Sequence, residues 1–376
     1  MTTQSDFPQE LLSKPPEVRL AYFRNRIVAH PYLKEAHQKI WQALQNPSKA
    51  HLIFVIGPTG VGKTTLRSRL EQQLWGAGIS AIEKNPGHIP VIGLEVVVAD
   101  ADNFRWRDYY TRALHALDEP AMEEKELPLR IERERPDLKS SGRYKITSEL
   151  RWALEQALHH RCPAAFIVDE AQHFRRISGG RRLLDQMDTI KSLANLTGIP
   201  HVLIGTYELL SFSHLSAQLD RRSCEIHFPR YHLDIPEELQ AFKRVLLTFQ
   251  RGLPLMGEPD LLSQVEYFYE NSVGCVGVLK DWLTRALAAS LENGQETLTR
   301  KVLEEHALPT RSLLRMAREM REGEESLAPN AREQTELRSL LGLSTEMTKE
   351  QPANSSRKVG KRNPMRDVVG NHEEPN

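Results

Sequence analysis

One eight-residue segment constrains the fold of this chain more than any other feature. It follows a short apolar run at residues 52–56, precedes a stretch with helical periodicity, and reads Gly57-Pro58-Thr59-Gly60-Val61-Gly62-Lys63-Thr64. Its glycines allow backbone angles that point successive N–H groups at one anion. A helix that begins directly after them presents the positive end of its dipole to the same anion. The segment and its context predict a loop that binds the phosphates of a nucleoside triphosphate.

The residues that end this loop have separate predicted roles. We expect Lys63 to reach the β- and γ-phosphates and the hydroxyl of Thr64 to hold Mg²⁺. Thr65, the next residue, is a candidate contact to the α-phosphate. The predicted cofactors are therefore a purine nucleoside triphosphate and Mg²⁺.

A second motif places two carboxylates at the end of another apolar run. Phe166-Ile167-Val168 leads directly into Asp169 and Glu170. Asp169 is the predicted contact to the water shell of the Mg²⁺ beside Thr64, and Glu170 is the predicted general base that polarises the attacking water. This pair favours hydrolysis over phosphoryl transfer to a metabolite. An acidic strand end that merely caps the next helix is the alternative, which the phosphate loop makes the weaker one.

Apolar runs alternate with helical segments through the first two thirds of the chain. The candidate strands cover residues 52–56, 91–98, 164–168, 201–204 and 224–228. This alternation predicts an α/β fold whose parallel five-stranded sheet is flanked by helices on both faces. Beyond Pro236 the pattern becomes helical throughout, at residues 236–251, 260–270, 276–292 and 297–306.

We therefore expect four parts in the chain. They are an N-terminal amphipathic helical segment (1–45), a nucleotide-binding core (46–232) with an insertion or mobile loop at 118–145, a small all-helical lid domain (233–322) and a flexible tail (323–376). The tail is a candidate tether for partner proteins, or a disordered solubilising end.

Composition limits the compartment and the mode of binding. Fifty basic residues balance fifty acidic ones, which excludes wrapping of nucleic acid by bulk charge but leaves room for a local basic patch. The sequence has no stretch of about 18 apolar residues, so we expect no membrane span. Its first residues lack the basic and then apolar regions of a signal peptide, so we do not expect export. The cysteines are few, odd in number and widely spaced, which argues against a disulfide framework and fits the cytoplasm: Cys162, Cys224 and Cys275.

Two further segments are candidates for contact with the γ-phosphate. Thr206 ends the fourth apolar run and is placed to touch the γ-phosphate or the attacking water, unless it belongs only to a strand-ending turn. Arg221 and Arg222 precede the last candidate strand. Either one is a candidate to reach the γ-phosphate of a neighbouring subunit and stabilise the transition state there. A solvated basic turn is the alternative.

The series of motifs resembles that of the AAA+ ATPases and, more narrowly, of the TnsC/TniB family of transposition regulators, over roughly residues 17–306. Besides the two ATPase motifs, the resemblance rests on the stretch Arg19 to Pro31, on Ile204-Gly205-Thr206 and on the turn Gly274-Cys275-Val276-Gly277. It implies a slow, assembly-coupled ATPase that forms head-to-tail oligomers or helical filaments on duplex DNA, without sequence preference. Such proteins link target selection to the transposase, and CRISPR-associated transposons use members of the family.

The same resemblance assigns residues around the nucleotide and exposes two departures. It implies that Ile27, Val28 and His30 border the adenine of ATP, although core packing also explains the first two. Many AAA+ proteins carry an arginine where this chain has Val278, so a phosphate sensor on the lid is absent or replaced by Lys280. The interval between the two ATPase motifs is also long, because of segment 118–145.

Three basic patches are candidates for contact with DNA phosphates. The first interleaves basic and aromatic groups after the second strand, and all three also fit solvated charged faces. The members are Arg105, Trp106 and Arg107; Lys139, Arg143 and Lys145; and Arg175, Arg176, Arg181 and Arg182. Two other functions stay open: a protein-binding signalling or secretion switch without DNA, and a replication-initiator or helicase-loader ATPase.

Overall fold

The computed structural model of the chain describes residues 6–46, 51–97, 104–119, 141–175, 182–213, 223–328 and 331–343. Its contacts divide the chain into two units, Met1–Ser326 and Leu327–Asn376, and each is described by itself. The candidate finger residues Arg221 and Arg222 lie outside the described residues, as do Lys139, Arg176 and Arg181.

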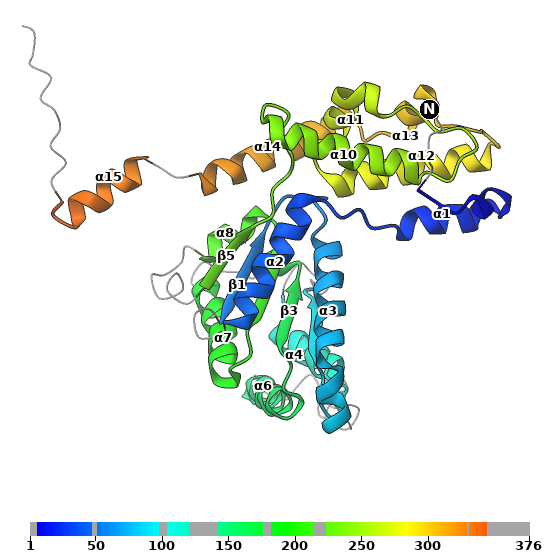
Figure 1. Cartoon of the computed structure of the whole chain (residues 1–376). Helices are drawn as coiled ribbons and strands as arrows, with labels where there is room; N and C mark the ends of the chain where they lie inside the picture. The colour runs from blue at the N-terminus through cyan, green and yellow to red at the C-terminus, as the bar shows by residue number, and fades with distance from the viewer. Residues whose placement is uncertain are drawn as a thin grey trace, which may run out of the picture. The chain divides into compact units, whose positions relative to one another are not determined.

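The predicted parallel five-stranded sheet is confirmed (Figure 1). Its strands are β1 (Leu52–Ile56), β2 (Val91–Glu95), β3 (Ala165–Asp169), β4 (His201–Gly205) and β5 (Ser223–His227), in the order β2-β3-β4-β1-β5. In the register of the sheet Ile56 lies opposite Gly205, and Val168 opposite Leu203. Because all these strands are parallel, the loops after β1, β3 and β4 emerge at the same edge of the sheet.

Helices cover both faces of the sheet, because side chains on a strand alternate between faces. Ile53 and Val55 face a core built with α2 (Pro31–Gln45) and α3 (Lys63–Lys84). On the other face α4 (Trp106–Ala116) packs through Tyr109, whose ring stacks on that of Phe166 at a centroid distance of 6.1 Å. The helices α6 (Ser141–Arg161) and α7 (Arg182–Thr197) continue this layer. Since α6 begins at Ser141, the last five residues of the predicted 118–145 loop are helical.

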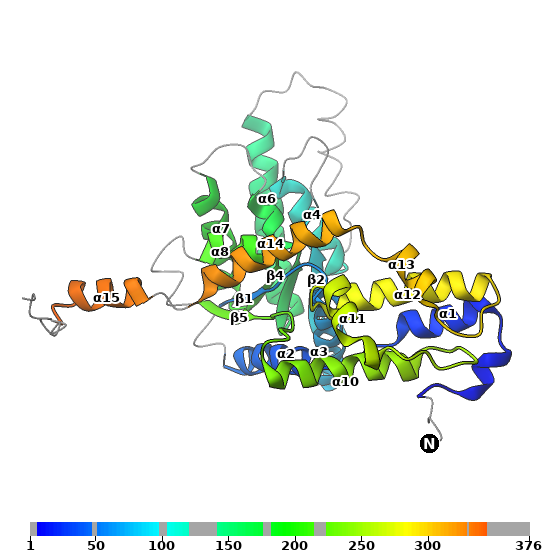
Figure 2. The ribbon, with the colours of Figure 1, turned by 90° about the horizontal axis from the view of Figure 1, so that it is seen from above.

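The helical lid surrounds a separate core (Figure 2). Trp282 is fully buried there, and its Nε1–H donates to the carbonyl oxygen of Leu303 at 2.8 Å. The principal lid helices are α10 (Pro236–Gly252), α11 (Val265–Ser272), α12 (Val276–Glu292) and α13 (Arg300–His306), with the short η4 (Leu262–Gln264) between α10 and α11. Of the other short elements, η1 (Gln9–Ser13) precedes α1, η2 (Ala171–Arg175) follows β3, and η3 (Tyr207–Leu209) and α8 (Leu210–Ser213) follow β4.

The N-terminal segment, expected as one part, contributes to both cores. Phe23 of α1 (Pro16–Asn25) is buried in the lid, with its ring 6.0 Å from that of Phe249, whereas α2 packs on the sheet. The linker between α1 and α2 therefore passes from the lid core to the sheet core.

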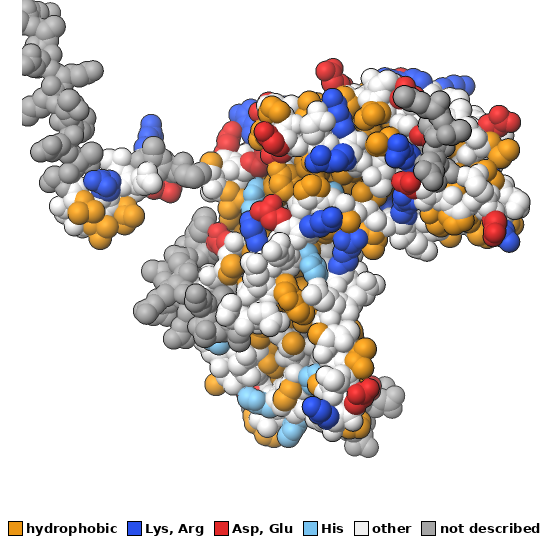
Figure 3. Space-filling view, viewed as in Figure 1, with side chains coloured by type: hydrophobic (Ala, Val, Ile, Leu, Met, Phe, Trp, Pro, Cys, Tyr) orange, Lys and Arg blue, Asp and Glu red, His pale blue; other side chains and the backbone are white. Residues whose placement is uncertain are grey.

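Helices also extend into the stretch expected as a flexible tail. α14 (Thr310–Leu327) runs through residue 323, and Glu324 on it accepts two hydrogen bonds from Arg230, at 2.8 and 3.0 Å. In the second unit, α15 (Ala331–Leu340) and the residues after it carry a group of exposed leucines (Figure 3): Leu337, Leu340, Leu341 and Leu343. Residues 344–376 lie outside the description.

All three cysteines are free thiols. Every helix in the described ranges is too short or too polar to cross a bilayer.

The buried His201 should make the fold sensitive to acid. Its Nδ1–H donates to the carbonyl oxygen of Ile199 at 2.9 Å, and burial lowers the pKa of His201 from 6.5 to about 4. The unfolded chain then binds a proton at a higher pH than the folded chain. The stabilising contribution is complete above about pH 6.5 and is lost as the pH falls toward about 4.

We expect the variant His201→Phe to lose less stability in acid than the parent. Between pH 7 and pH 5 the parent should lose about 2 kcal/mol more free energy of unfolding than the variant. Urea unfolding at the two pH values measures this difference. An identical pH dependence of both proteins would contradict the assignment.

Candidate nucleotide-binding site

The phosphate loop lies between β1 and α3 and needs glycine at two of its positions. Gly60 and Gly62 have φ angles of 78° and 116°, in the left-handed region that side chains with a Cβ rarely adopt. α3 begins at Lys63 without a side-chain N-cap and without an acidic residue in its first turn. The positive end of a 22-residue helix therefore lacks any anionic side chain of its own.

Lys63 is buried beneath this loop. Only 7% of the residue is exposed, and its Nζ donates to the carbonyl oxygens of Gly57 and Pro58 at 3.0 and 2.8 Å. Burial lowers the pKa of Lys63, against the opposing effect of Glu170 and Asp169. A desolvated ammonium at an uncapped helix start fits the binding of an anion such as a triphosphate.

Asp169 ends β3 and is almost fully buried. Its Oδ1 accepts a hydrogen bond from the N–H of Glu170 at 2.9 Å, and its Oδ2 lies 3.5 Å from Nη1 of Arg67. Burial raises the pKa of Asp169, and the N–H of Glu170 and the charge of Arg67 oppose this rise. Sequence reasoning missed Arg67, although it follows Lys63 by four residues and so shares its face of α3.

Glu170 occupies a left-handed conformation with a φ of 53°. Its Oε2 accepts a hydrogen bond from Nε2 of Gln172 and lies 3.9 Å from Nε2 of His173. Gln172 and His173 were both missed, because a turn after a strand end has no periodicity that would predict where its side chains point. The predicted residues Thr64 and Thr206 lie in the first turn of α3 and directly after β4.

The lid rests directly on the phosphate loop through the start of α12. The N–H of Val278 donates to the carbonyl oxygen of Gly60 at 3.2 Å. A Cβ added to Gly60 would lie 2.4 Å from Cγ2 of Val278, and a Cβ added to Gly277 would lie 2.4 Å from the Gly60 oxygen. Val278, at the position of the expected lid sensor, is thus packed against the loop.

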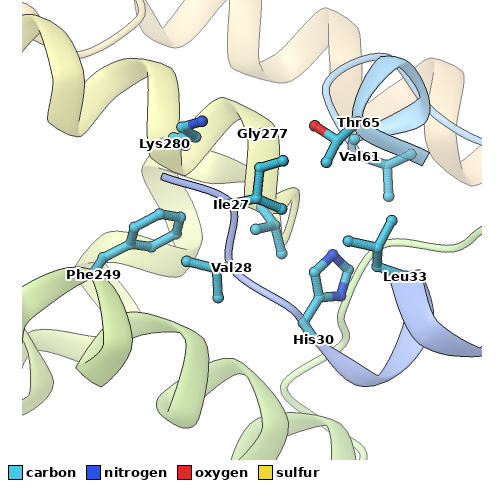
Figure 4. Close-up of a pocket in the computed structure, with 11 residues that line it drawn as sticks. Ile27, Val28, His30, Leu33, Val61, Thr65, Phe249, Gly277 and Lys280 are labelled. Carbon is cyan, nitrogen blue, oxygen red and sulfur yellow. The ribbon is translucent and has the colours of Figure 1, made fainter. Parts of the chain in front are cut away.

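A small pocket lies between the α1–α2 linker, the phosphate loop and the lid (Figure 4). It brings together the three residues expected at the adenine, Ile27, Val28 and His30, with other nucleotide-site candidates, Val61, Gly62, Thr65 and Lys280. Four further lining residues were not predicted from the sequence: Leu33, Phe249, Val276 and Gly277. Its volume of about 40 Å³ holds only a few water molecules.

His30 presents an uncharged ring to this pocket. Its Nδ1 lies 3.0 Å from the hydroxyl of Tyr231, and burial, with the charge of Arg69, lowers the pKa of His30 to about 4. Ile27 is 41% exposed, so packing alone does not explain it, whereas Val28 also belongs to the lid core. Burial lowers the pKa of Lys280, the cationic residue of the pocket lining.

Two of the candidate DNA patches meet at an aromatic cluster. The rings of Phe104 and Trp106 lie 5.0 and 5.9 Å from that of Phe174 on η2. Arg105 and Arg175, which are adjacent in the chain to these rings, are exposed. Trp106 itself is packed within the cluster, also against Tyr110. Of the other patch members, Arg107 is half-buried on α4, Arg143 and Lys145 lie in α6, and Arg182 begins α7.

Comparison with known families supports the class of this site. Residues 45–212, which hold the phosphate loop, Asp169, Glu170 and Thr206, match the family described as AAA domain. This part of the chain is therefore similar to an AAA domain. A comparison with curated proteins found no match.

Several solved structures are similar to the chain. The ORC2 protein of Aeropyrum pernix, with ADPNP and ADP, is 15% identical over 78% of this chain and 73% of its own, with a TM-score of 0.47. Cdc6p of Pyrobaculum aerophilum is 14% identical over 76% and 69%, with a TM-score of 0.47. A Walker-type ATPase of Pyrococcus abyssi is 19% identical over 82% and 76%, with a TM-score of 0.39. The narrower resemblance to TnsC/TniB is not confirmed by these comparisons and stays a prediction.

The contact between α12 and the phosphate loop yields a test of the pocket. In Gly277→Ala the new Cβ would collide with the Gly60 oxygen, because the two atoms would lie 2.4 Å apart. The lid wall of the pocket should shift from the core wall, so we expect at least about tenfold weaker ATP binding, or about 1.4 kcal/mol. Equilibrium titration with a fluorescent ATP analogue measures the affinity.

Gly76→Ala is the matched control, because nothing lies within 4 Å of a Cβ at this position of α3. This variant should bind as the parent does. Equal affinities of Gly277→Ala and Gly76→Ala would show that α12 does not form part of the nucleotide pocket.

Proposed function

We propose that this chain binds ATP with Mg²⁺ and hydrolyses it to ADP and phosphate. One observation carries the proposal: the buried ammonium of Lys63 lies at an uncapped helix start, and the carboxylates of Asp169 and Glu170 end a strand of the same sheet edge. Bound ATP would supply the γ-phosphoryl group, and Mg²⁺ would neutralise charge that develops on it.

Each residue of the site then has a separate role in hydrolysis. Lys63 offsets the charge of the β- and γ-phosphates, while the hydroxyl of Thr64 and the carboxylate of Asp169 hold the metal and its water shell. Glu170 accepts a proton from the attacking water, and Thr206 orients that water or the γ-phosphate. Ile27, Val28 and His30 border the adenine.

Assembly and DNA binding extend the proposal beyond a single subunit. Arg221 or Arg222 of a neighbouring copy would complete the site, which makes the contact head to tail. Such a contact forms rings where the rotation closes and helical filaments where it does not. The sequence resemblance to TnsC/TniB supports assembly on duplex DNA and a link from target selection to the transposase.

We assign DNA binding to the surface around the aromatic cluster, where Arg105 and Arg175 are exposed. Arg105 and Arg175 would contact phosphates and read no bases, so binding would be salt-sensitive and nearly sequence-independent. A protein-only switch would show no binding at low salt with ATP, and a helicase loader would prefer single strands.

The first test concerns the nucleotide. Lys63→Ala should lose ATP binding and assembly on duplex DNA, because the buried charge that faces the phosphates is removed. Lys84→Ala, an exposed lysine at the other end of α3, is the matched control. ATP uptake by Lys63→Ala at the affinity of the control would refute the assignment of the phosphate loop.

Glu170→Gln separates binding from hydrolysis. The amide has the shape of the carboxylate but cannot accept the proton, so turnover should fall by at least about a hundredfold while ATP binding is retained. Assembled complexes should persist in electron micrographs. Unchanged phosphate release would remove Glu170 as the base.

The second test concerns DNA. The double variant Arg105→Glu with Arg175→Glu should weaken duplex binding and reduce the slope of log affinity against log salt by about 2, one for each phosphate contact. The control is Lys301→Glu with Arg321→Glu, which makes the same charge change at exposed lid positions. Gel shifts over a salt series should show the loss only in the first variant, and equal losses in both would argue for nonspecific charge.

A further inference from the structure

A buried amide connects the proposed base to the end of β4. Gln172 on η2 is only 7% exposed. Its Nε2 donates to Oε2 of Glu170, and its Oε1 accepts a hydrogen bond from the N–H of Thr206 at 3.2 Å. Only a side chain that both donates and accepts can make this pair of contacts, and glutamine does so at this reach.

The surrounding backbone leaves room for this amide. A Cβ added to Gly205 would lie 2.4 Å from Oε1 of Gln172 and 2.7 Å from Cδ1 of Leu209. The carbonyl oxygen of Gly205 also accepts a hydrogen bond from the N–H of Gly57, at 3.2 Å. The glycine that admits Gln172 is therefore bonded to the first residue of the phosphate loop.

The contacts on Glu170 favour one oxygen. Gln172 and His173 both lie against Oε2, so Oε1 is the oxygen that we assign to the attacking water. The backbone of Glu170 is in a left-handed turn, and its side chain is partly exposed. Without the amide, rotation about its side-chain bonds would move Oε1 away from the water.

We infer that Gln172 is a positioning residue, which fixes the carboxylate of Glu170 at a set separation from Thr206. This inference rests on the proposed ATPase activity. The base and the residue expected at the γ-phosphate come from different strands, and Gln172 joins the two by one side chain. Its loss should impair the chemical step and leave nucleotide binding intact.

Two substitutions at position 172 test this. Gln172→Met keeps the length of the side chain without its hydrogen bonds, and Gln172→Glu keeps its shape but turns the donor into an acceptor that repels Glu170. We expect kcat to fall by about 10- to 100-fold in both, while the KM and the dissociation constant for ATP change by less than about twofold. Gln186→Met and Gln186→Glu are matched controls, since Gln186 on α7 is equally buried, at 6%.

A double-mutant cycle distinguishes positioning from a structural role. If Gln172 acts through the carboxylate, Gln172→Met should lower kcat little further in a Glu170→Gln background. Gly205→Ala, which displaces the amide without changing it, should reproduce the kcat loss of Gln172→Met. Melting temperatures of all variants identify those that are folded.

The outcomes separate this inference from the proposed function. A parent protein without ATPase activity would refute the proposed function itself. An active parent whose Gln172 and Gly205 variants retain kcat would overturn the inference alone. Loss of ATP affinity in step with kcat, or full additivity with Glu170→Gln, would show that Gln172 supports the fold and not the position of the base.

Discussion

The burial of the Lys63 ammonium is the constraint on which the rest of the site depends. An ion removed from water is costly unless it is paired, and here its partners are two uncharged carbonyls of its own loop. The lowered pKa of Lys63 expresses this cost. A bound polyphosphate would replace the lost hydration with opposite charge. An anion would therefore stabilise this buried ammonium more than it would stabilise the ammonium of an exposed lysine. The turn glycines Gly60 and Gly62 directly precede this lysine, and the uncapped α3 begins at it.

The lid contacts the phosphate loop through the backbone of α12, where Val278 occupies the position expected for a charged sensor. Val278 and Gly277 lie so close to Gly60 that a Cβ at Gly60 or at Gly277 would require neighbouring atoms to shift. The pocket beside this contact is lined by residues of both the lid and the phosphate loop. A displacement of α12 would therefore act on the phosphate loop through the hydrogen bond between Val278 and Gly60.

Local sequence patterns predicted most of the fold. The features that they did not predict depend on contacts between residues far apart in the chain. The strand at 52–56, the glycine loop and the carboxylates after β3 each have a signal within a few residues. Arg67 shares a helix face with Lys63, so periodicity could have found it. Phe249 and Gln172 come to the site from separate elements, and no spacing in the chain relates them to it, whereas Lys280 was a candidate because it follows the lid turn. The division of the N-terminal segment between two cores likewise depends on where the lid packs, which the amphipathic pattern of α1 and α2 does not specify.

The short helix η2 joins the two ends of the proposed mechanism. Within five residues it carries Gln172, which contacts Glu170 and the end of β4, and Phe174, which packs against the rings of Phe104 and Trp106. If duplex DNA binds the neighbouring Arg105 and Arg175, any movement of this face reaches η2 through packed rings. Packed interiors transmit such displacement because they have few voids to absorb it. The residues proposed to contact DNA and the proposed base are therefore connected by the contacts of one five-residue turn.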